Sequence, residues 1–292
     1  MSWNAHGAYA RDGDLIQLVG LRHKNFIFRL RAGAEFQSHR GVLKHDEIIG
    51  KPWGSQVFSH NGSPFFLLPP SLADVLAITR RNTQILYPKD IGFILVMMGI
   101  GPGKRVVEAG TGSGALTTAF AFAVGSQGCV STYEIRSDFQ ELARKNISLL
   151  GLDDRVVFNL RDIREGFTEQ DADALFLDVP NPWDYIPQVR AALKPGGNFG
   201  CILPTANQVQ KLLVALREEH FAFLEVCEIL LRWYRAHPAR FRPTDRMVGH
   251  TGYLIFARPV LVEDENQSQE LLEEAGIAFL DNDEENDLYG YE

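Results

Sequence analysis

The chain has 292 residues, of which 45% are hydrophobic and 23% charged, with a net charge of −8 at pH 7. This composition is typical of a folded protein of one or two domains and excludes a largely disordered chain. No apolar run approaches the roughly 20 residues that a membrane-spanning helix needs. The first residues also lack the basic and apolar regions of a signal peptide. We therefore expect a cytoplasmic protein with no membrane segment.

The negative charge is concentrated at the end of the chain. Between Glu263 and Glu292 there are 12 acidic and no basic residues, which leaves 29 basic against 25 acidic residues, about +4, elsewhere. We expect residues 261–292 to form an acidic, disordered tail. The whole-chain charge therefore does not exclude a nucleic-acid partner. The three cysteines are widely separated in the sequence, so we expect reduced thiols and neither a disulfide nor a metal site.

Residues 1–70 alternate short β-like runs with turns that contain Gly, Asn and Ser. Such closely spaced strands predict a small antiparallel barrel or sandwich. The strands are expected at Leu15–Gly20, Asn25–Leu30, Gln56–Ser59 and Phe65–Leu68. Two prolines then break the pattern, and Ser71 is expected to cap a helix over Leu72–Arg80. We place a linker helix at residues 71–84 and a second domain at residues 85–260.

In the second domain the pattern changes to strand, turn and helix in repetition. Continuous apolar strands between amphipathic helices predict a parallel sheet covered on both faces. Strands are expected at Arg105–Glu108, Cys129–Tyr133, Arg155–Leu160, Ala174–Leu177, Asn198–Leu203, Phe223–Ile229 and Gly252–Ala257. Helices are expected up to Val124 and over Ser137–Leu150, Tyr185–Leu193 and Ala206–Glu219, the third one closed by Lys194–Gly197.

A glycine loop, Gly110-Thr-Gly112-Ser-Gly114, follows the first of these strands and opens a helix. Glycines let a ligand approach the backbone closely, and the helix N-terminus offers free N–H groups. Glu134 ends the next strand about 20 residues later, where a carboxylate accepts hydrogen bonds from ribose hydroxyls. This pair indicates a nucleotide-like cofactor, and the alternative is a tight turn with an unrelated surface glutamate.

Two further strand ends carry carboxylates. The Gly-x-Gly-x-Gly spacing differs from the Gly-x-Gly-x-x-Gly of a dinucleotide site, and Asp162 lies where an adenine amino group donates. Together these features favour S-adenosylmethionine over NAD. Asp178 begins the segment Asp178-Val-Pro180-Asn-Pro-Trp183, where it can stabilise positive charge on a substrate ring nitrogen. Asp178 as a helix cap and Trp183 as a packing residue are the alternatives.

The glycine loop, the Asp178–Trp183 segment, Thr83–Asp90 and Arg246–Tyr253 together resemble the tRNA (adenine-58-N1)-methyltransferases of the TrmI type. His45–Lys51 resembles a signature of the N-terminal domain of that family. The resemblance covers nearly all of residues 1–260 and leaves out the acidic tail. It implies a small N-terminal β-barrel-like domain, a seven-stranded Rossmann-like class I methyltransferase domain and a homotetramer. The implied reaction transfers a methyl group from S-adenosylmethionine to N1 of the T-loop adenine of tRNA.

The resemblance also implies site residues. The cofactor contacts are expected from Leu86, Glu108, Gly110, Gly112, Ser113, Gly114, Ala115, Leu116, Glu134, Asp162, Ile163 and Asp178, the last of which is also the candidate catalytic residue. Adenine N1 carries an in-plane lone pair, so the transfer is mainly a matter of alignment. No metal is expected. We infer that the base must be unstacked from the tRNA to reach the pocket.

The segment between the last two strands interleaves cations with aromatic rings, a composition that favours RNA binding over a simple solvated connection. The expected substrate-binding residues are Tyr87, Pro180, Trp183, Arg232, Tyr234, Arg235, Arg240, Arg242, Arg246 and His250. A structural role is the alternative for Tyr87 and His250. Three other functions stay open: a protein isoaspartyl or small-molecule methyltransferase, a non-catalytic RNA-binding subunit, and an NAD-dependent oxidoreductase.

Overall fold

The computed structural model describes residues 3, 6–21, 24–80 and 86–261. The chain packs as two compact units, one of Met1–Asn82 with Arg144–Asp154 and the other of Thr83–Ala143 with Arg155–Glu292. The predicted domain boundaries near residues 70, 84 and 260 stay predictions. Apart from its first residue, the predicted acidic tail at 261–292 lies outside the described residues.

The first unit contains an antiparallel sheet in the order β2-β1-β6-β5. Its strands are β1 (Leu15–Gly20), β2 (Lys24–Arg29), β5 (Gln56–Phe58) and β6 (Pro64–Leu68), with a separate hairpin of β3 (Glu35–Ser38) and β4 (Gly41–Lys44). Side chains of both sheets share one apolar core that includes Leu18, Leu43 and Leu67. The predicted small antiparallel domain is confirmed. The β3–β4 hairpin was not predicted, because polar Glu35 and Gln37 alternate with half-buried residues there.

The predicted helix after the two prolines is α1 (Leu72–Ile78). The Ser71 hydroxyl accepts from the Asp74 N–H at 3.2 Å, and the Asp74 carboxylate accepts from the Ser71 N–H at 3.0 Å. This reciprocal capping box satisfies two backbone donors at the helix start. The helix ends at Ile78, two residues before the predicted end, because Thr79 has an extended ψ of 123°.

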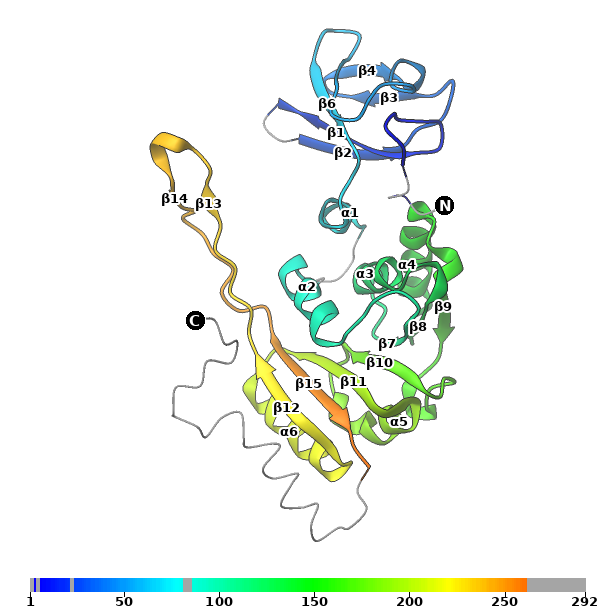
Figure 1. Cartoon of the computed structure of the whole chain (residues 1–292), viewed down its shortest axis with the longest axis vertical. Helices are drawn as coiled ribbons and strands as arrows, with labels where there is room; N and C mark the ends of the chain where they lie inside the picture. Colours follow the sequence, from blue (N-terminus) through cyan, green and yellow to red (C-terminus); the bar gives the residue numbers. More distant parts are fainter. Residues whose placement is uncertain (1–2, 4–5, 22–23, 81–85, 262–292) are drawn as a thin grey trace. The chain divides into compact units, whose positions relative to one another are not determined.

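The second unit is built on a seven-stranded sheet in the order β12-β15-β11-β10-β7-β8-β9 (Figure 1). The strands are β7 (Arg105–Ala109), β8 (Cys129–Glu134), β9 (Val156–Leu160), β10 (Ala172–Leu177), β11 (Leu193–Leu203), β12 (Phe221–Cys227) and β15 (Tyr253–Pro259). The seven-stranded fold implied by the resemblance is confirmed. The sheet is mostly parallel, as predicted, and β15 is the exception because it runs antiparallel to both β11 and β12. The long connection from β12 to β15 leaves and re-enters the sheet at the same end.

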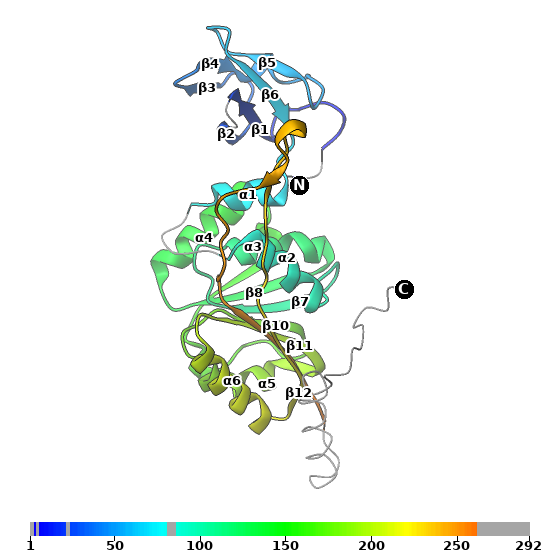
Figure 2. The ribbon, with the colours of Figure 1, turned by 90° about the vertical axis from the view of Figure 1, so that its left-hand side faces the viewer.

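Helices cover both faces of this sheet. In Figures 1 and 2, α2 (Pro88–Met97) and α3 (Ala115–Val124) lie on one face, and α5 (Ile186–Ala192) and α6 (Ala206–Glu218) lie on the other. Helix α4 (Ser137–Leu150) has the predicted bounds. Helix α2 was not predicted. Its sequence is apolar on several sides, so it lacks the amphipathic period by which a helix is recognised.

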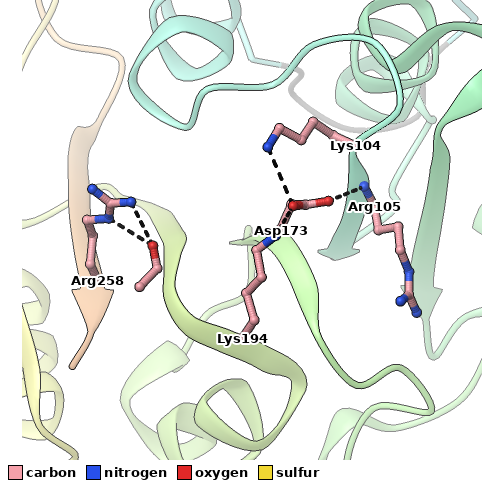
Figure 3. Close-up of polar contacts among 6 residues, drawn as sticks. Lys104, Arg105, Asp173, Lys194 and Arg258 are labelled. Atoms are coloured by element: carbon pink, nitrogen blue, oxygen red, sulfur yellow. Dashed lines mark hydrogen bonds and ion pairs between the residues drawn. The ribbon is translucent and has the colours of Figure 1, made fainter. Parts of the chain in front are cut away.

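Strand β11 begins at Leu193, so the predicted closing turn Lys194–Gly197 is part of an irregular strand. Figure 3 shows the contacts at this end of the sheet, where the Asp173 carboxylate, near the start of β10, joins the segments that begin β7 and β11. It accepts from the Arg105 N–H at 2.8 Å, pairs with Lys104 at 3.5 Å, and makes a short contact with Lys194. The Asp173 pKa is lowered, since these bonds outweigh the effect of burial. The amino ends of β7, β10 and β11 are thereby fixed.

The connection between β12 and β15 extends from the sheet as a two-stranded projection, which we call the arm (residues 228–252; Figures 1 and 2). Within it β13 (Tyr234–Arg235) pairs with β14 (Arg242–Pro243) around a short 3₁₀ turn at Pro238–Arg240. The basic and aromatic segment that the sequence places between the last two strands therefore forms the outer part of a hairpin.

Candidate active site

A cleft of about 530 Å³ opens at the carboxyl ends of β7, β8, β9 and β10. This volume lies within the range of small-molecule and cofactor sites. Its walls are the turns that directly follow these four strands, as expected for an open α/β sheet. The described residues that line it are Ala109, Gly110, Gly112, Tyr133, Glu134, Ile135, Arg136, Phe139, Arg161, Asp162, Ile163, Arg164, Asp178, Val179, Pro180, Asn181 and Tyr185.

The glycine loop passes very close to the end of β10. A Cβ atom on Gly110 would lie 2.1 Å from the Asp178 carbonyl oxygen, and Gly110 has a φ of +98°. Glycine is therefore required at this position for two reasons, the close approach and the left-handed backbone. The Asp178 N–H also donates to the Ala109 carbonyl at 2.8 Å. The loops after β7 and β10 thus form one rigid floor.

Glu134 fixes the glycine loop from the side of β8. One carboxylate oxygen accepts from the Gly112 N–H at 3.0 Å, and the other accepts from the N–H groups of Ile135 and Arg136 at 3.0 and 3.1 Å. A carboxylate has about four acceptor positions, so these bonds leave capacity for a ligand in the cleft. The predicted acceptor for ribose hydroxyls lines the cleft and is held in place by three backbone donors.

Glu108 lies beneath the loop and does not line the cleft; it is 1% exposed. Its Oε2 accepts from the hydroxyls of Thr117 at 2.5 Å and Thr132 at 2.7 Å. Its Oε1 is buried and has no hydrogen-bond partner among the described residues. Burial raises the Glu108 pKa to about 8, the two hydroxyl bonds oppose this, and the charges of Asp178 and Glu134 add to it.

Asp162 and Ile163 follow β9 and line the cleft on its third side. Asp162 accepts from the Arg164 N–H at 2.9 Å, which caps the short 3₁₀ turn Ile163–Glu165 and directs the loop. The Asp162 side chain is 42% exposed, so its carboxylate is open to a ligand. An apolar side chain beside a free acceptor suits a purine ring with an exocyclic amine.

Asp178 is the carboxylate at the floor of the cleft. Asp178 is exposed and lines the cleft, and protein atoms surround much of its carboxyl group. Desolvation raises the Asp178 pKa to about 6. A carboxylate in such a place gains much from a nearby positive charge, because its own charge is poorly hydrated. Pro180 lies beside it in the same wall.

Five further residues were predicted to contact the cofactor, namely Leu86, Ser113, Gly114, Ala115 and Leu116. Ser113 is buried, Gly114 is the N-cap of α3 with a φ of +79°, and Ala115 and Leu116 form the first turn of that helix. Leu86 is 9% exposed. None of these five lines the cleft as its described residues define it. The neighbouring segment 81–85 lies outside the description.

The predicted substrate residues are found in four places, of which the cleft wall holds Pro180. Tyr87 is the N-cap residue of α2 and is 38% exposed. Trp183 packs partly against the core, with the Lys211 ammonium 5.2 Å from its ring. The rest are on the arm, where Arg235 and Arg242 both pair with Asp245, at 2.6 and 2.8 Å. The remaining arm residues are Arg232, Tyr234, Arg240, Arg246 and His250; Tyr234 stacks on Phe241 at 5.1 Å, and the others are exposed.

Two models of known protein families match this chain. Residues 68–245 match the family model described as tRNA methyltransferase complex GCD14 subunit, and residues 10–57 match the model described as TrmI-like N-terminal. The chain belongs to this family of tRNA methyltransferases. A TrmI-family relative from Methanocaldococcus jannaschii, named tRNA (adenine(57)-N(1)/adenine(58)-N(1))-methyltransferase, is 36% identical over 82% of this chain and 93% of its own length.

Two solved structures resemble this chain in both fold and sequence. The tRNA (m1A58) methyltransferase TrmI of Aquifex aeolicus has 37% identity and a TM-score of 0.73, over 87% of this chain and 100% of its own. A structure from Thermotoga maritima, described as a SAM-dependent O-methyltransferase, has 42% identity and a TM-score of 0.80, over 88% of this chain and 97% of its own.

The structure adds cleft residues that the sequence did not single out. Arg136 follows β8 and stacks its guanidinium 3.6 Å from the centre of the Phe139 ring. Arg161 and Arg164 flank Asp162 after β9. A signal for all four was present, because each lies within a few residues of a predicted strand end. Their residue types gave no reason to prefer these three arginines and this phenylalanine over others near the surface.

Within the described ranges no three His, Cys, Asp or Glu residues gather as a metal site would require. The described helices also include none with the length and apolar character to span a bilayer. The thiols of Cys129, Cys201 and Cys227 are free, and Cys201 is fully buried.

Proposed function

We propose that this TrmI-family chain transfers a methyl group from S-adenosylmethionine to N1 of adenine 58 in the T-loop of tRNA. The observation that carries the proposal is the cleft floor, where Asp178 stands against the glycine loop at a contact that permits no side chain on Gly110. Relatives that are named for this reaction match most of the chain, and their names indicate the tRNA substrate.

The cleft residues fit the cofactor. Glu134 and Asp162 offer acceptors for ribose hydroxyls and an adenine amine, and Ile163 offers an apolar contact. The carboxylate of Asp178 lines the cleft and suits a cation. S-adenosylmethionine, when bound, supplies an electrophilic methyl group on a positively charged sulfur.

The residues have few chemical tasks in this transfer. Adenine N1 attacks with its own lone pair, so no base needs to remove a proton first. The base becomes positively charged as the methyl group arrives, and the carboxylate of Asp178 stabilises that charge electrostatically. The rigid floor formed with Ala109 and Gly110 holds the carboxylate in place. Asp178 therefore both orients the exocyclic amine and balances the developing charge.

The substrate base must leave its stack to enter so narrow a site. Pro180 borders the cleft beside Asp178, and Trp183 follows in the 3₁₀ turn Pro182–Tyr185. We assign Pro180 to the wall against which the adenine lies. We assign Tyr87 to the path by which the adenine enters the cleft. The arginines Arg232, Arg240 and Arg246 are assigned to the tRNA backbone, while Asp245 already partly neutralises Arg235 and Arg242.

Incubation of the protein with unmodified tRNA and labelled cofactor, followed by nucleoside analysis, tests the proposal. We expect 1-methyladenosine in the T-loop. Asp178→Ala should lose product while it still binds the cofactor, whereas Glu218→Ala, at the exposed end of α6, should behave as the parent. A 2′-O-methylated nucleoside or a methylated small hydroxyl compound would instead favour O-methyl transfer. Binding of NAD in place of S-adenosylmethionine would contradict the cofactor assignment.

We further propose that the chain works as a homotetramer assembled in part through the arm. An isolated two-stranded hairpin is marginally stable in water, and this one presents large apolar side chains to solvent. Leu230 is 66% exposed, Trp233 67% and Phe241 69%. Contiguous exposed apolar residues of this kind are typical of protein interfaces.

The two roles of the arm are separable by mutation. Trp233→Ser with Phe241→Ser should lower the molecular mass in solution, as measured by light scattering. Arg240→Glu should keep the mass and weaken tRNA binding, with a shallower dependence of affinity on salt. A monomeric parent protein would contradict the assembly, and unchanged tRNA affinity in Arg240→Glu would remove that residue from the RNA contacts.

A further inference from the structure

His250 lies three residues before the start of β15, at the base of the arm, where the arm joins the sheet; we call this base the root. Its Nε2 faces the Pro204 carbonyl oxygen at 2.9 Å, directly after β11. Its Nδ1 makes a short hydrogen bond with the carboxylate of Glu228, directly after β12. One imidazole ring thus joins the ends of three neighbouring strands at the edge of the sheet where the cleft opens.

The hydrogen-bond partners define the protonation state of this ring. A carbonyl oxygen accepts and does not donate, and the same is true of an ionised carboxylate. Each ring nitrogen must therefore carry a hydrogen if both bonds are made, and an imidazole with two N–H groups is a cation. With Glu228 ionised, the two bonds therefore require the imidazolium form of His250.

The neighbouring residue is anchored in a different way. Thr251 accepts from the Lys89 ammonium at 2.6 Å and donates to the Asp90 carboxylate at 3.0 Å. Lys89 and Asp90 are themselves paired at 2.7 Å, with side chains only 6% and 1% exposed. This buried network ties the β15 side of the root to the start of α2, and it does not need a proton on His250.

We propose that His250 is a positioning residue whose imidazolium form clasps the β12 side of the arm to the sheet, so that loss of its proton loosens the arm at Glu228. The proposal concerns the arm itself and stands whether the arm contacts RNA, another copy of the chain or both.

The charged groups around His250 set the direction of the pH dependence. Hydrogen bonds to Glu228 and to the Pro204 carbonyl raise the His250 pKa from its ordinary value of 6.5, while slight desolvation and the Lys89 charge oppose them. The ring of Tyr253 lies 5.0 Å from the His250 ring. The clasp is therefore complete in mild acid and is lost as the pH rises through the raised pKa.

Two measurements on the full-length protein test the clasp. The NMR titration of the His250 ring should show both nitrogens protonated at about pH 6, with a midpoint above 6.5. Glu228→Gln should return the midpoint toward 6.5, since an amide carries no charge to favour the cation. A neutral ring at about pH 6 would overturn the proposal.

Backbone ¹⁵N relaxation reports on the arm. The order parameters of residues 228–233 should fall toward about 0.6 above the His250 midpoint, the range of a flexible backbone. His250→Gln should show the lower values at both pH values. His237→Gln, an exposed histidine of the same arm, should behave as the parent. Order parameters at 228–233 that ignore pH in the parent protein would refute the clasp, whatever the methylation assay shows.

Discussion

Two carboxyl groups beside the glycine loop, Glu108 and Asp178, have raised pKa values in different surroundings. Glu108 is enclosed in the core with two hydroxyl donors, and Asp178 faces the cleft. Ligand charge reaches Asp178 directly, whereas Glu108 acts through the threonines that it orients. Thr132, one of these threonines, also bonds to Thr111 of the loop at 2.6 Å. We therefore expect Glu108 to affect mainly the stability of the fold and Asp178 to affect mainly the proposed reaction.

The pH dependence of catalysis should report Asp178. If the ionised form is the active one, kcat/KM for the cofactor falls as the pH drops below about 6, the Asp178 pKa. In the pH profile of kcat, the fall in activity should occur at a lower pH, because the positive charge of the bound cofactor stabilises the ionised carboxylate of Asp178. In Asp178→Asn this acidic limb should vanish, with activity reduced by about a hundredfold. A limb retained in Asp178→Asn would assign it to another group.

The pH dependence of stability should report Glu108. Its pKa is raised from 4.5 to about 8 in the folded state, so the native protein binds more protons than the unfolded chain between these values. The stabilisation is complete below pH 4.5 and is lost as the pH rises toward 8. Denaturant titrations should show this loss, up to about 1.4 kcal/mol per pH unit. Glu108→Gln should flatten the profile, and an unchanged slope would contradict the raised pKa.

At the scale of elements, the turn after β7 should tolerate no side chain at Gly110. Gly110→Ala meets the Asp178 carbonyl in addition to the strain of a positive φ, whereas Gly103→Ala, with a φ of +81° and open space around it, meets the strain alone. The strain costs about 1–2 kcal/mol, and the overpacking adds about 1–3 kcal/mol. Denaturant unfolding should separate the two variants by that difference. Only Gly110→Ala should also lose cofactor affinity, because the floor of the cleft must shift.

The elements that the sequence predicted are those with a clear period or cap. Strand β1 and helix α4 match their predicted bounds, and α1 begins at its predicted Ser71 cap. The misses have physical causes. Helix α2 is apolar on several sides, and the irregular start of β11 depends on Asp173, whose partners are far away in the sequence.

The candidate site was predictable where chemistry follows strand ends. Glu134, Asp162 and Asp178 lie where the order of strands and turns places them, and all three line the cleft. The position of Glu108 beneath the loop was not predictable, because it depends on which face of β7 its side chain takes. The clasp at His250 was not predictable either, since Glu228 and Pro204 lie 22 and 46 residues away in the sequence.

At the scale of the whole molecule, charge is divided between a body of about +4 and a tail with 12 acidic residues. The tail lies outside the described residues, so its proposed role rests on charge alone. We predict that the tail competes with RNA for the basic surface and weakens non-specific binding. Deletion of residues 263–292 should then raise the affinity for random RNA at low ionic strength.

A full-length variant with the 12 acidic residues of the tail changed to their amides separates charge from steric bulk. The amide variant should match the deletion, because only the charge has been removed. Both gains should disappear toward about 1 M salt, where the Debye length is only about 3 Å. An amide variant that binds random RNA as weakly as the parent would show that the negative charge of the tail does not shield the protein from RNA.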